Sequence, residues 1–222
     1  MTKIILYGFD ISPPSRAVKL TLAALQLPYE YVIVNTFKKE QNSPEYLKKN
    51  PQHTVPTLED NGKYISDSHA ISAYLVKKYG KDSSLYPSDV FQSAIVDQRL
   101  HYDSSTLFTS IWFGITKPLV LAGKTQIEKA KIAELVEAYD LLETFLASNN
   151  YIAGPDLTIA DFSIVTTISA LMLLLMPDSS KYPKLNAWLK RIQELPYYKE
   201  ATGAGADELE SLLKSTNFTI ES

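Results

Sequence analysis

Short apolar runs alternate with helical periodicity over the first eighty residues, as in a small α/β unit. The pattern predicts strands at 3–9, 29–34, 55–59 and 63–66, and helices at 15–26, 43–49 and 67–79. Asp60-Asn61-Gly62, between the last two strands, is typical of a tight hairpin turn. Strands joined by a helix pair in parallel, whereas strands joined by a hairpin pair antiparallel. The order βαβαββα therefore predicts a mixed four-stranded sheet.

Beyond a polar linker the pattern is helical, and no strand is expected after Ser88. Helices are predicted at 88–118, 126–148, 157–176, 183–193 and 207–214. The stretch 162–176 is apolar nearly all round, which indicates a buried helix surrounded by others. Gly203-Ala204-Gly205 is interpreted as a hinge before the tail. The predicted domains are an α/β domain at 1–80, a linker at 81–87 and an all-helical domain at 88–222.

Composition narrows the classes of function. The chain has 222 residues and a net charge of -3, so charge favours neither a nucleic acid nor an anionic membrane as a partner. It contains no cysteine, which excludes disulfides, thiolate metal sites and a cysteine nucleophile. Three scattered histidines do not suggest a metal site. The N-terminus lacks the features of a secretory signal, so we expect a cytoplasmic protein.

Two features between Asn50 and Tyr79 suit a small zwitterionic ligand. Pro56 cannot donate to a strand ladder, so the backbone of Val55 is left free to pair with an extended ligand, particularly if the bond between them is cis. Asp67 and Ser68 begin the helix at 67–79, where free N–H groups favour a carboxylate and Asp67 could take an ammonium. The alternative is that Asp67 or Ser68 simply caps this helix.

Ser12 occupies a similar position, between the first strand and the first helix. Ligands in open α/β folds gather at the carboxyl ends of strands, so Ser12 and the Asp67-Ser68 pair could face one crevice. Ser12 could equally be only a helix cap. The chain lacks the glycine pattern of a nucleophile elbow around Ser12, which argues against a serine hydrolase.

Several motifs in this order resemble a cytosolic glutathione transferase, most closely the arthropod delta and epsilon classes, with epsilon favoured. They are Ser12-Pro13-Pro14-Ser15-Arg16, His53-Thr54-Val55-Pro56, Asp67-Ser68-His69-Ala70-Ile71, Leu85-Tyr86-Pro87 and Thr158-Ile159-Ala160-Asp161-Phe162. The resemblance covers almost the whole chain. It implies an N-terminal thioredoxin-like domain that binds glutathione, an all-helical C-terminal domain with a hydrophobic pocket, and a homodimer. Glutathione would be a co-substrate, with no further cofactor.

The resemblance also implies roles for individual residues. Ser12 matches the catalytic residue whose hydroxyl stabilises the glutathione thiolate, and Tyr7 is a rival, because other classes use a tyrosine near this position. The implied glutathione-binding residues are Ser12, Gln41, His53, Thr54, Val55, Pro56, Asp67, Ser68 and His69. Gln41 departs from the family pattern, since related enzymes often have a histidine there, and an amide supplies no positive charge.

Apolar residues at helical spacing predict the electrophile pocket less specifically. The candidates are Ile11, Pro14, Phe37, Phe108, Ile111, Trp112, Ile115 and Leu119, although the same stripe could be plain core. The tail residues Leu209, Leu212, Leu213 and Phe218 could cover the pocket or pack elsewhere. His69 and His101 are interpreted as lying near a dimer contact.

These inferences predict an enzyme that conjugates glutathione to small hydrophobic electrophiles, as in detoxification, and that could also reduce organic hydroperoxides. A thiol of pKa about 8.5 is only about 3% thiolate at pH 7, so lowering its pKa is the essential task. The alternative is a non-catalytic binding protein of the same fold that sequesters hydrophobic ligands.

Overall fold

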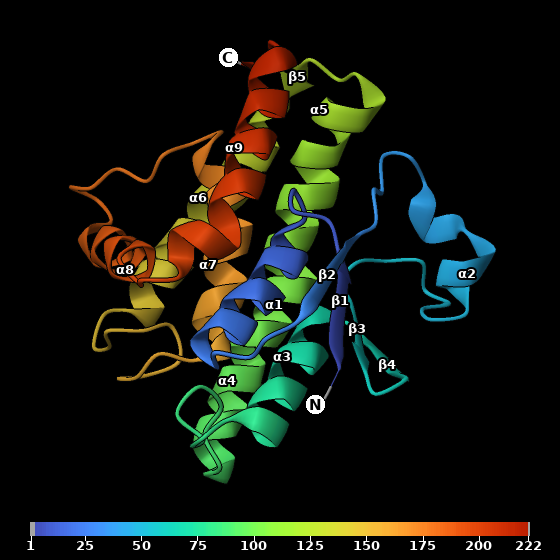
Figure 1. Ribbon diagram of the computed structural model, residues 1–222. Coiled ribbons are helices and arrows are strands. Elements are labelled where there is room, and N and C mark those ends of the chain that lie inside the picture. The colour runs from blue at the N-terminus through green and yellow to red at the C-terminus, as the bar shows by residue number, and fades with distance from the viewer. Residues whose placement is uncertain (1–2, 222) are drawn as a thin grey trace.

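The computed structural model describes residues 3–221 and has two parts that lie side by side, an α/β layer and a bundle of helices (Figure 1). The α/β part contains β1 (Ile4–Gly8), α1 (Pro13–Ala24), β2 (Glu30–Ile33), α2 (Pro44–Leu47), β3 (Thr57–Asp60), β4 (Lys63–Ser66) and α3 (Ser68–Tyr79). A 3₁₀ turn at Glu40–Asn42 precedes α2. The order of elements is the predicted βαβαββα.

The sheet has the strand order β2-β1-β3-β4. β1 is parallel to β2 and antiparallel to β3, which forms the hairpin with β4, so the predicted mixed sheet is confirmed. Alternate residues of β1 face opposite sides. Ile4 and Leu6 pack in the core beneath α1 and α3, whereas Ile5 and Tyr7 pack with Tyr46 of α2 on the other face.

The helical part contains α4 (Val90–Tyr102), α5 (Lys117–Ala122), α6 (Lys129–Phe145), α7 (Ile159–Met172), α8 (Pro183–Gln193) and α9 (Tyr198–Ser215). Between α4 and α5 the chain stays helical but adopts wider π turns at Asp103–Leu107 and Thr109–Thr116. The single regular helix predicted at 88–118 is therefore wrong in its periodicity. A π turn changes which side chains share a face, and that change matters for the cleft described below.

The expectation of no strand after Ser88 is also wrong. Two short strands, β5 (Gln126–Ile127) and β6 (Thr219–Ile220), pair in parallel near the C-terminus. Backbone bonds from Thr219 to Thr125 and from Glu221 to Ile127 fix the tail to this loop. Strands of two residues carry no readable periodicity, and here the partners lie more than ninety positions apart in the sequence.

Gly203-Ala204-Gly205 is not a hinge but lies within the regular helix α9. A Cβ atom on Gly205 would lie 1.9 Å from the carbonyl oxygen of Asp10, so the glycine permits α9 to approach the turn before α1. Gly203 has no such constraint, because its Cβ would meet only Lys199 Cγ, at 3.5 Å. The hinge interpretation fails because close packing, rather than flexibility, requires a glycine at 205.

α7 is the centre of the helical part, as its apolar sequence predicts. Twelve of its residues are buried, and its N-terminus has the predicted capping box between Thr158 and Asp161. Asp161 also accepts hydrogen bonds from Ile152 N and Trp188 Nε1, at 2.9 and 2.8 Å. Burial raises the pKa of Asp161, and these donors oppose that shift. α7 packs against α1, so the two parts of the molecule meet along these helices.

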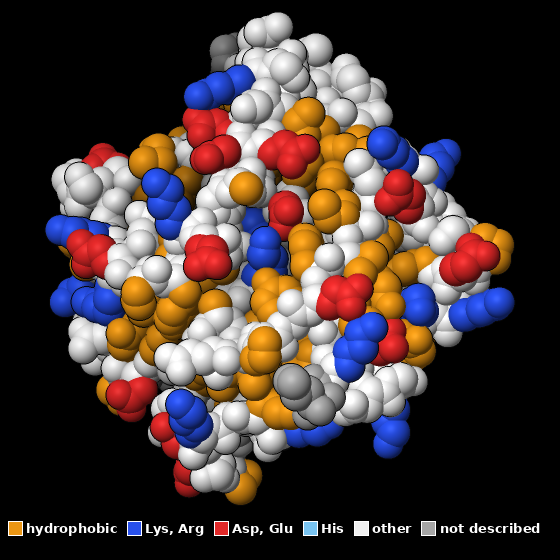
Figure 2. Space-filling model, viewed as in Figure 1, with side chains coloured by type: hydrophobic (Ala, Val, Ile, Leu, Met, Phe, Trp, Pro, Cys, Tyr) orange, Lys and Arg blue, Asp and Glu red, His pale blue; other side chains and the backbone are white. Residues whose placement is uncertain are grey.

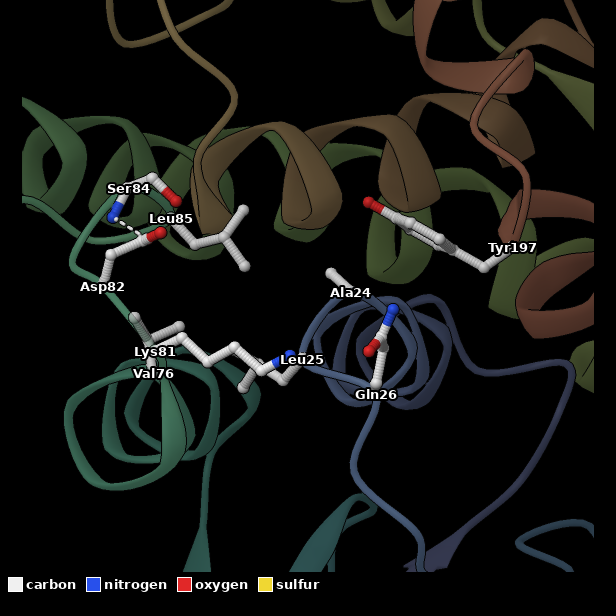
Figure 3. A pocket seen from close by; sticks show the side chains of 9 residues that line it. All are labelled: Ala24, Leu25, Gln26, Val76, Lys81, Asp82, Ser84, Leu85 and Tyr197. Atoms are coloured by element: carbon white, nitrogen blue, oxygen red, sulfur yellow. Dashed lines mark hydrogen bonds between the residues drawn. The ribbon is translucent and has the colours of Figure 1, made fainter.

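The segment between α3 and α4 is anchored to the helical part. The Leu85 carbonyl accepts a hydrogen bond from Ile159 N at 2.9 Å, and the buried Tyr86 bonds Asp97. A polar cavity of about 250 Å³ lies beside this segment, with Gln26 and Tyr197 on its other side (Figure 3). Domain boundaries at 80 and 88 stay a prediction.

Acidic and basic side chains are interspersed over the face shown in Figure 2, and its described residues form no continuous basic area. Among residues 3–221, no helix combines the length and the apolar character needed to cross a bilayer.

The contact between α9 and the turn before α1 predicts opposite effects for two neighbouring glycines. Gly205→Ala should destabilise the protein by about 1–3 kcal/mol, because its Cβ collides with the Asp10 carbonyl. Gly203→Ala, the matched control, should be neutral or stabilise by up to about 1 kcal/mol through helix propensity. Urea denaturation of both variants measures the difference. Equal effects would show that the close approach does not control stability.

Candidate functional site

A cleft of about 680 Å³ lies where the α/β part meets the helical part. It is bounded by the β1–α1 turn, the loops before α2 and β3, the start of α3, the π turns and α7. All nine residues predicted to bind glutathione line it, namely Ser12, Gln41, His53, Thr54, Val55, Pro56, Asp67, Ser68 and His69. The tertiary structure therefore brings together side chains from four separate segments.

Ser12 is the N-cap residue of α1, but its side chain makes no capping hydrogen bond. An N-cap oxygen accepts from the second or third residue of a helix, and here the second is Pro14, which has no N–H. The Ser12 backbone is fixed by an N–H bond to Phe9 O at 2.9 Å. The hydroxyl thus stands at a positive helix end without serving as a cap.

A buried asparagine shapes the loop before β3. Asn50 Nδ2 donates to Thr54 O at 2.9 Å and to Thr57 Oγ1 at 3.1 Å, while its Oδ1 accepts from Gln52 N. Tyr46 also donates its hydroxyl to Thr54 O, at 2.6 Å. Asn50 is the first residue of the segment 50–79 whose features suit a zwitterionic ligand, but it was not predicted as a site residue. An asparagine that bonds backbone several residues away has no distinctive sequence signal.

This loop presents the backbone of Val55 to the cleft. The Val55–Pro56 bond is cis, and Val55 precedes β3 rather than belonging to it. Within residues 3–221, neither the amide nor the carbonyl of Val55 has a hydrogen-bond partner. The predicted free backbone before Pro56 is therefore present, although the predicted strand begins two residues too early.

Asp67 caps α3, as one of the two interpretations of the sequence expects, and it also lines the cleft. Its Oδ1 caps α3 by accepting from His69 N and Ala70 N, at 2.9 and 3.0 Å. The residue has a φ of 74°, in the left-handed region, and its side chain is exposed at the cleft. Capping thus uses one oxygen of the Asp67 carboxylate. Asp67 also lines the cleft, next to Ser68.

His69 connects α3 to the helical part. Its Nε2 lies 2.7 Å from Ser163 Oγ and 3.4 Å from Asp103 Oδ2, and Ser163 donates to the same carboxylate. Asp103 is buried, lines the cleft, and has no partner for Oδ1 within the described chain. Sequence reasoning missed Asp103 and Ser163, because the histidine and its partners lie in different parts of the chain.

The cleft lining includes polar side chains and two unpredicted lysines, Lys39 and Lys117. Gln41 and His53 lie there, and the buried Gln41 Oε1 has no hydrogen-bond partner among residues 3–221. Lys39 also lines the cleft, two residues before Gln41, whereas its neighbour Lys38 does not. The positive charge that Gln41 lacks is therefore available from Lys39.

Tyr7, the rival to Ser12, does not line the cleft and packs with Tyr46 on the other face of the sheet. Its hydroxyl donates to Glu59 at 2.7 Å, and its ring packs edge-on against Tyr46. Burial, together with the hydrogen bond to Glu59, raises the pKa of Tyr7. A phenol that is committed to a carboxylate in this way is a poor candidate to stabilise a thiolate at the cleft.

The predicted electrophile pocket divides into two sets. Pro14, Phe37, Phe108 and Trp112 line the cleft. Ile11, Ile111, Ile115 and Leu119 do not line it, and each is buried in the core around α7. For the helical residues the correction follows from the π turns, which change the side chains that share a face, whereas Ile11 lies in the turn before α1 and packs into the core.

Residues that the sequence analysis did not predict also line the cleft. Phe113, Lys117 and Leu121 line the cleft, and Phe113 packs edge-on against Phe108 with ring centroids 5.9 Å apart. The tail residues Leu209, Leu212, Leu213 and Phe218 pack in or against the helical core instead of covering the cleft. In the described part of the chain, no cluster of three potential metal ligands is present.

Comparisons with known proteins agree over both parts of the chain. Residues 6–83 match the family model described as glutathione S-transferase, N-terminal domain, and residues 125–191 match the corresponding C-terminal domain. Glutathione S-transferase 1 of Manduca sexta is 43% identical over 212 residues, which cover 95% of this chain and 97% of the relative.

Solved structures match the whole fold. An epsilon-class glutathione S-transferase from the housefly Musca domestica is 57% identical, with a TM-score of 0.96 over 98% of this chain and all of that one. A glutathione transferase homologue from Drosophila mojavensis, solved with bound glutathione, is 53% identical, with a TM-score of 0.95 over 99% and 100% of the two chains.

The hydrogen bonds of Asn50 predict that this side chain holds the loop in shape. Asn50→Asp keeps the volume but places an oxygen against the acceptors Thr54 O and Thr57 Oγ1, so we expect a loss of about 2–4 kcal/mol in unfolding free energy. The exposed Lys48→Ala should change it by less than about 0.5 kcal/mol. Thermal and urea denaturation test both, and an unaffected Asn50→Asp would contradict the structural role.

Proposed function

The chain belongs to the glutathione S-transferase family, and we propose that it conjugates the thiolate of glutathione to small hydrophobic electrophiles. The similarity to the housefly enzyme supports the epsilon class that the sequence favours. Glutathione serves as co-substrate, and the reaction needs no further cofactor. The observation that carries the proposal is the uncommitted Ser12 hydroxyl at the start of α1, in the cleft that holds all nine predicted glutathione contacts.

Ser12 would act by stabilising the charged sulfur. A hydrogen bond from its hydroxyl favours the thiolate over the thiol, and the positive end of α1 acts in the same direction. Lowering the thiol pKa by about 2 units corresponds to about 2.7 kcal/mol, which is within the combined reach of these interactions. The proton would leave to solvent, so Ser12 need not act as a base.

The remaining contacts would orient the peptide. The free backbone of Val55 suits the cysteinyl residue, while Asp67 and Ser68 suit the amino and carboxylate groups of the γ-glutamyl end. Thr54, Pro56 and His69 complete the wall around these groups. At the glycyl end, Gln41 and His53 would supply hydrogen bonds and Lys39 the positive charge.

The apolar side of the cleft would hold the electrophile. We propose that Pro14, Phe37, Phe108 and Trp112 contribute, together with the unpredicted Phe113 and Leu121. Aromatic side chains offer large apolar surfaces that admit varied small molecules without specific hydrogen bonds. This arrangement suits detoxification and is compatible with reduction of organic hydroperoxides by the same thiolate.

Assembly and location complete the proposal. We expect a cytoplasmic homodimer, with domains at 1–80 and 88–222 joined by the linker at 81–87. The exposed His101 of α4 stays a candidate for the dimer contact, whereas His69 is engaged with Ser163 within one chain. The named activity of the relatives favours catalysis over a purely sequestering role.

Replacing Ser12 tests the proposed chemistry directly. Ser12→Ala should raise the pKa of the bound thiol by about 1–2 units and lower conjugation of an aryl halide about 10- to 100-fold near pH 6.5. The ultraviolet absorbance of the thiolate, followed across pH, measures the pKa. Tyr7→Phe is the control and should leave it unchanged. The assignment is wrong if Tyr7→Phe moves the pKa and Ser12→Ala does not.

Lys39 provides a separate test of glycyl-end recognition. Lys39→Met should weaken glutathione binding about fivefold at low salt, as expected for one pair of charges in a solvated site, and added salt should reduce the difference. Lys38→Met is the matched control, because Lys38 lies outside the cleft. Quenching of tryptophan fluorescence measures affinity, since Trp112 lines the site. Equal losses in the two variants would rule out a specific contact.

A further inference from the structure

Arg16 of α1 is a buried charge without a carboxylate partner. Only 1% of the residue is exposed, and within residues 3–221 it forms no ion pair. Its one hydrogen bond runs from a terminal nitrogen to Thr166 O at 3.4 Å, and its Nε has no partner. A guanidinium in such a place is costly, and an apolar side chain of similar length would fill the space without that cost.

The ionisable groups that act on Arg16 form no ion pair with it. Asp10, in the turn before α1, is already paired with Lys19 at 2.8 Å. Tyr198 of α9 is the other titratable neighbour, and burial raises the pKa of its phenol, so it is neutral near pH 7. From α7, the Thr166 carbonyl also accepts from Ser169 at 2.8 Å. Burial lowers the pKa of Arg16 to about 10, which still leaves the guanidinium charged at neutral pH.

Arg16 lies directly behind the wall of the cleft. Its backbone N–H donates to Ser12 O at 3.1 Å, one helical turn earlier, and Ser12 lines the cleft. The carbonyl that its side chain contacts belongs to Thr166, and the next residue, Thr167, also lines the cleft. Side chains on a helix lean toward its N-terminus, which here is the end that carries Ser12. The guanidinium therefore lies between two elements that form the cleft.

We propose that Arg16 is a fixed, buried positive charge that stabilises the glutathione thiolate held at Ser12 without touching it. The proposal rests on the function proposed above and adds a second source of thiolate stabilisation. The protein interior screens a charge less than water does, so a buried guanidinium can act on a nearby thiolate without contact, and a shift of one pKa unit requires only about 1.4 kcal/mol. The geometry also explains why a costly charge occupies the interface between α1 and α7.

The experiment separates the effect of the charge at position 16 from the effect of the size and shape of the side chain. Arg16→Met removes the charge and keeps an extended side chain, whereas Arg16→Lys keeps the charge. We expect Arg16→Met to raise the bound-thiol pKa by about one unit, which lowers the thiolate fraction about tenfold well below that pKa. Arg16→Lys should restore most of the shift. The rate of conjugation by Arg16→Met should approach that of the unmodified protein at a pH above both thiol pKa values.

A control variant distinguishes loss of the Arg16 charge from a general disruption of α1. Thr21→Val removes a buried hydroxyl on the same helix, which bonds Ala17 O and Ser72 Oγ, and changes no charge. It should leave the thiol pKa unmoved. Binding of S-methylglutathione, which has no thiol, should be the same in all folded variants. The other titratable side chains that line the cleft are unchanged throughout, namely Lys39, His53, Asp67, His69, Asp103 and Lys117.

The outcomes distinguish this proposal from the function on which it rests. If Ser12→Ala raises the thiol pKa but folded Arg16→Met does not, Arg16 is only a packing residue and the inference is overturned. The same conclusion follows if Arg16→Met and Arg16→Lys shift the pKa equally. If Arg16→Met does not fold, Arg16→Gln replaces it as the variant that removes the charge, and an unmoved thiol pKa in folded Arg16→Gln overturns the inference. Failure of the unmodified protein to bind glutathione would instead contradict the proposed function.

Discussion

The packing of α1 against α7 is the contact on which the rest of the molecule depends. α1 belongs to the α/β part and α7 is the buried centre of the helical part, so this one interface sets how the two parts are placed. It also places Ser12, because the residue immediately precedes α1, and Ser12 lines the cleft. A displacement of α1 along α7 would move the hydroxyl relative to every side chain supplied by the helical part.

Several local contacts stabilise that interface. Gly205 lets α9 approach the carbonyl of Asp10, and Lys19 holds the Asp10 carboxylate. His69 reaches from α3 to Ser163 on α7 and ties a second element of the α/β part to the same helix. Polar contacts within an otherwise apolar interface favour one arrangement over alternatives, because a shift would leave buried groups unpaired.

The cleft itself combines rigid support with unused hydrogen-bonding capacity. Asn50 and Tyr46 fix the loop before β3, yet the Val55 backbone within that loop has no partner in the described chain. Pro14, the second residue of α1, offers no N–H, and the Ser12 hydroxyl makes no capping hydrogen bond. Such uncommitted groups on a fixed frame are what a peptide ligand can use, because little ordering remains to be done on binding.

The sequence by itself determined the order of elements, the mixed sheet, the central helix and nine residues that line the cleft, which were predicted as glutathione contacts. These rest on local chemistry: a two-residue period, a hairpin turn, a proline before a strand, and polar residues where helices begin. Only the tertiary structure decided which apolar residues face the cleft, because the π turns between α4 and α5 place Ile111 and Ile115 in the core and Phe113 at the surface. It also decided the close approach at Gly205, the contacts of Asp103, the burial of Arg16 and the pairing of β5 with β6. Each of these depends on atoms that are distant in the sequence, and a pattern that is read along one segment carries no information about its neighbours in space.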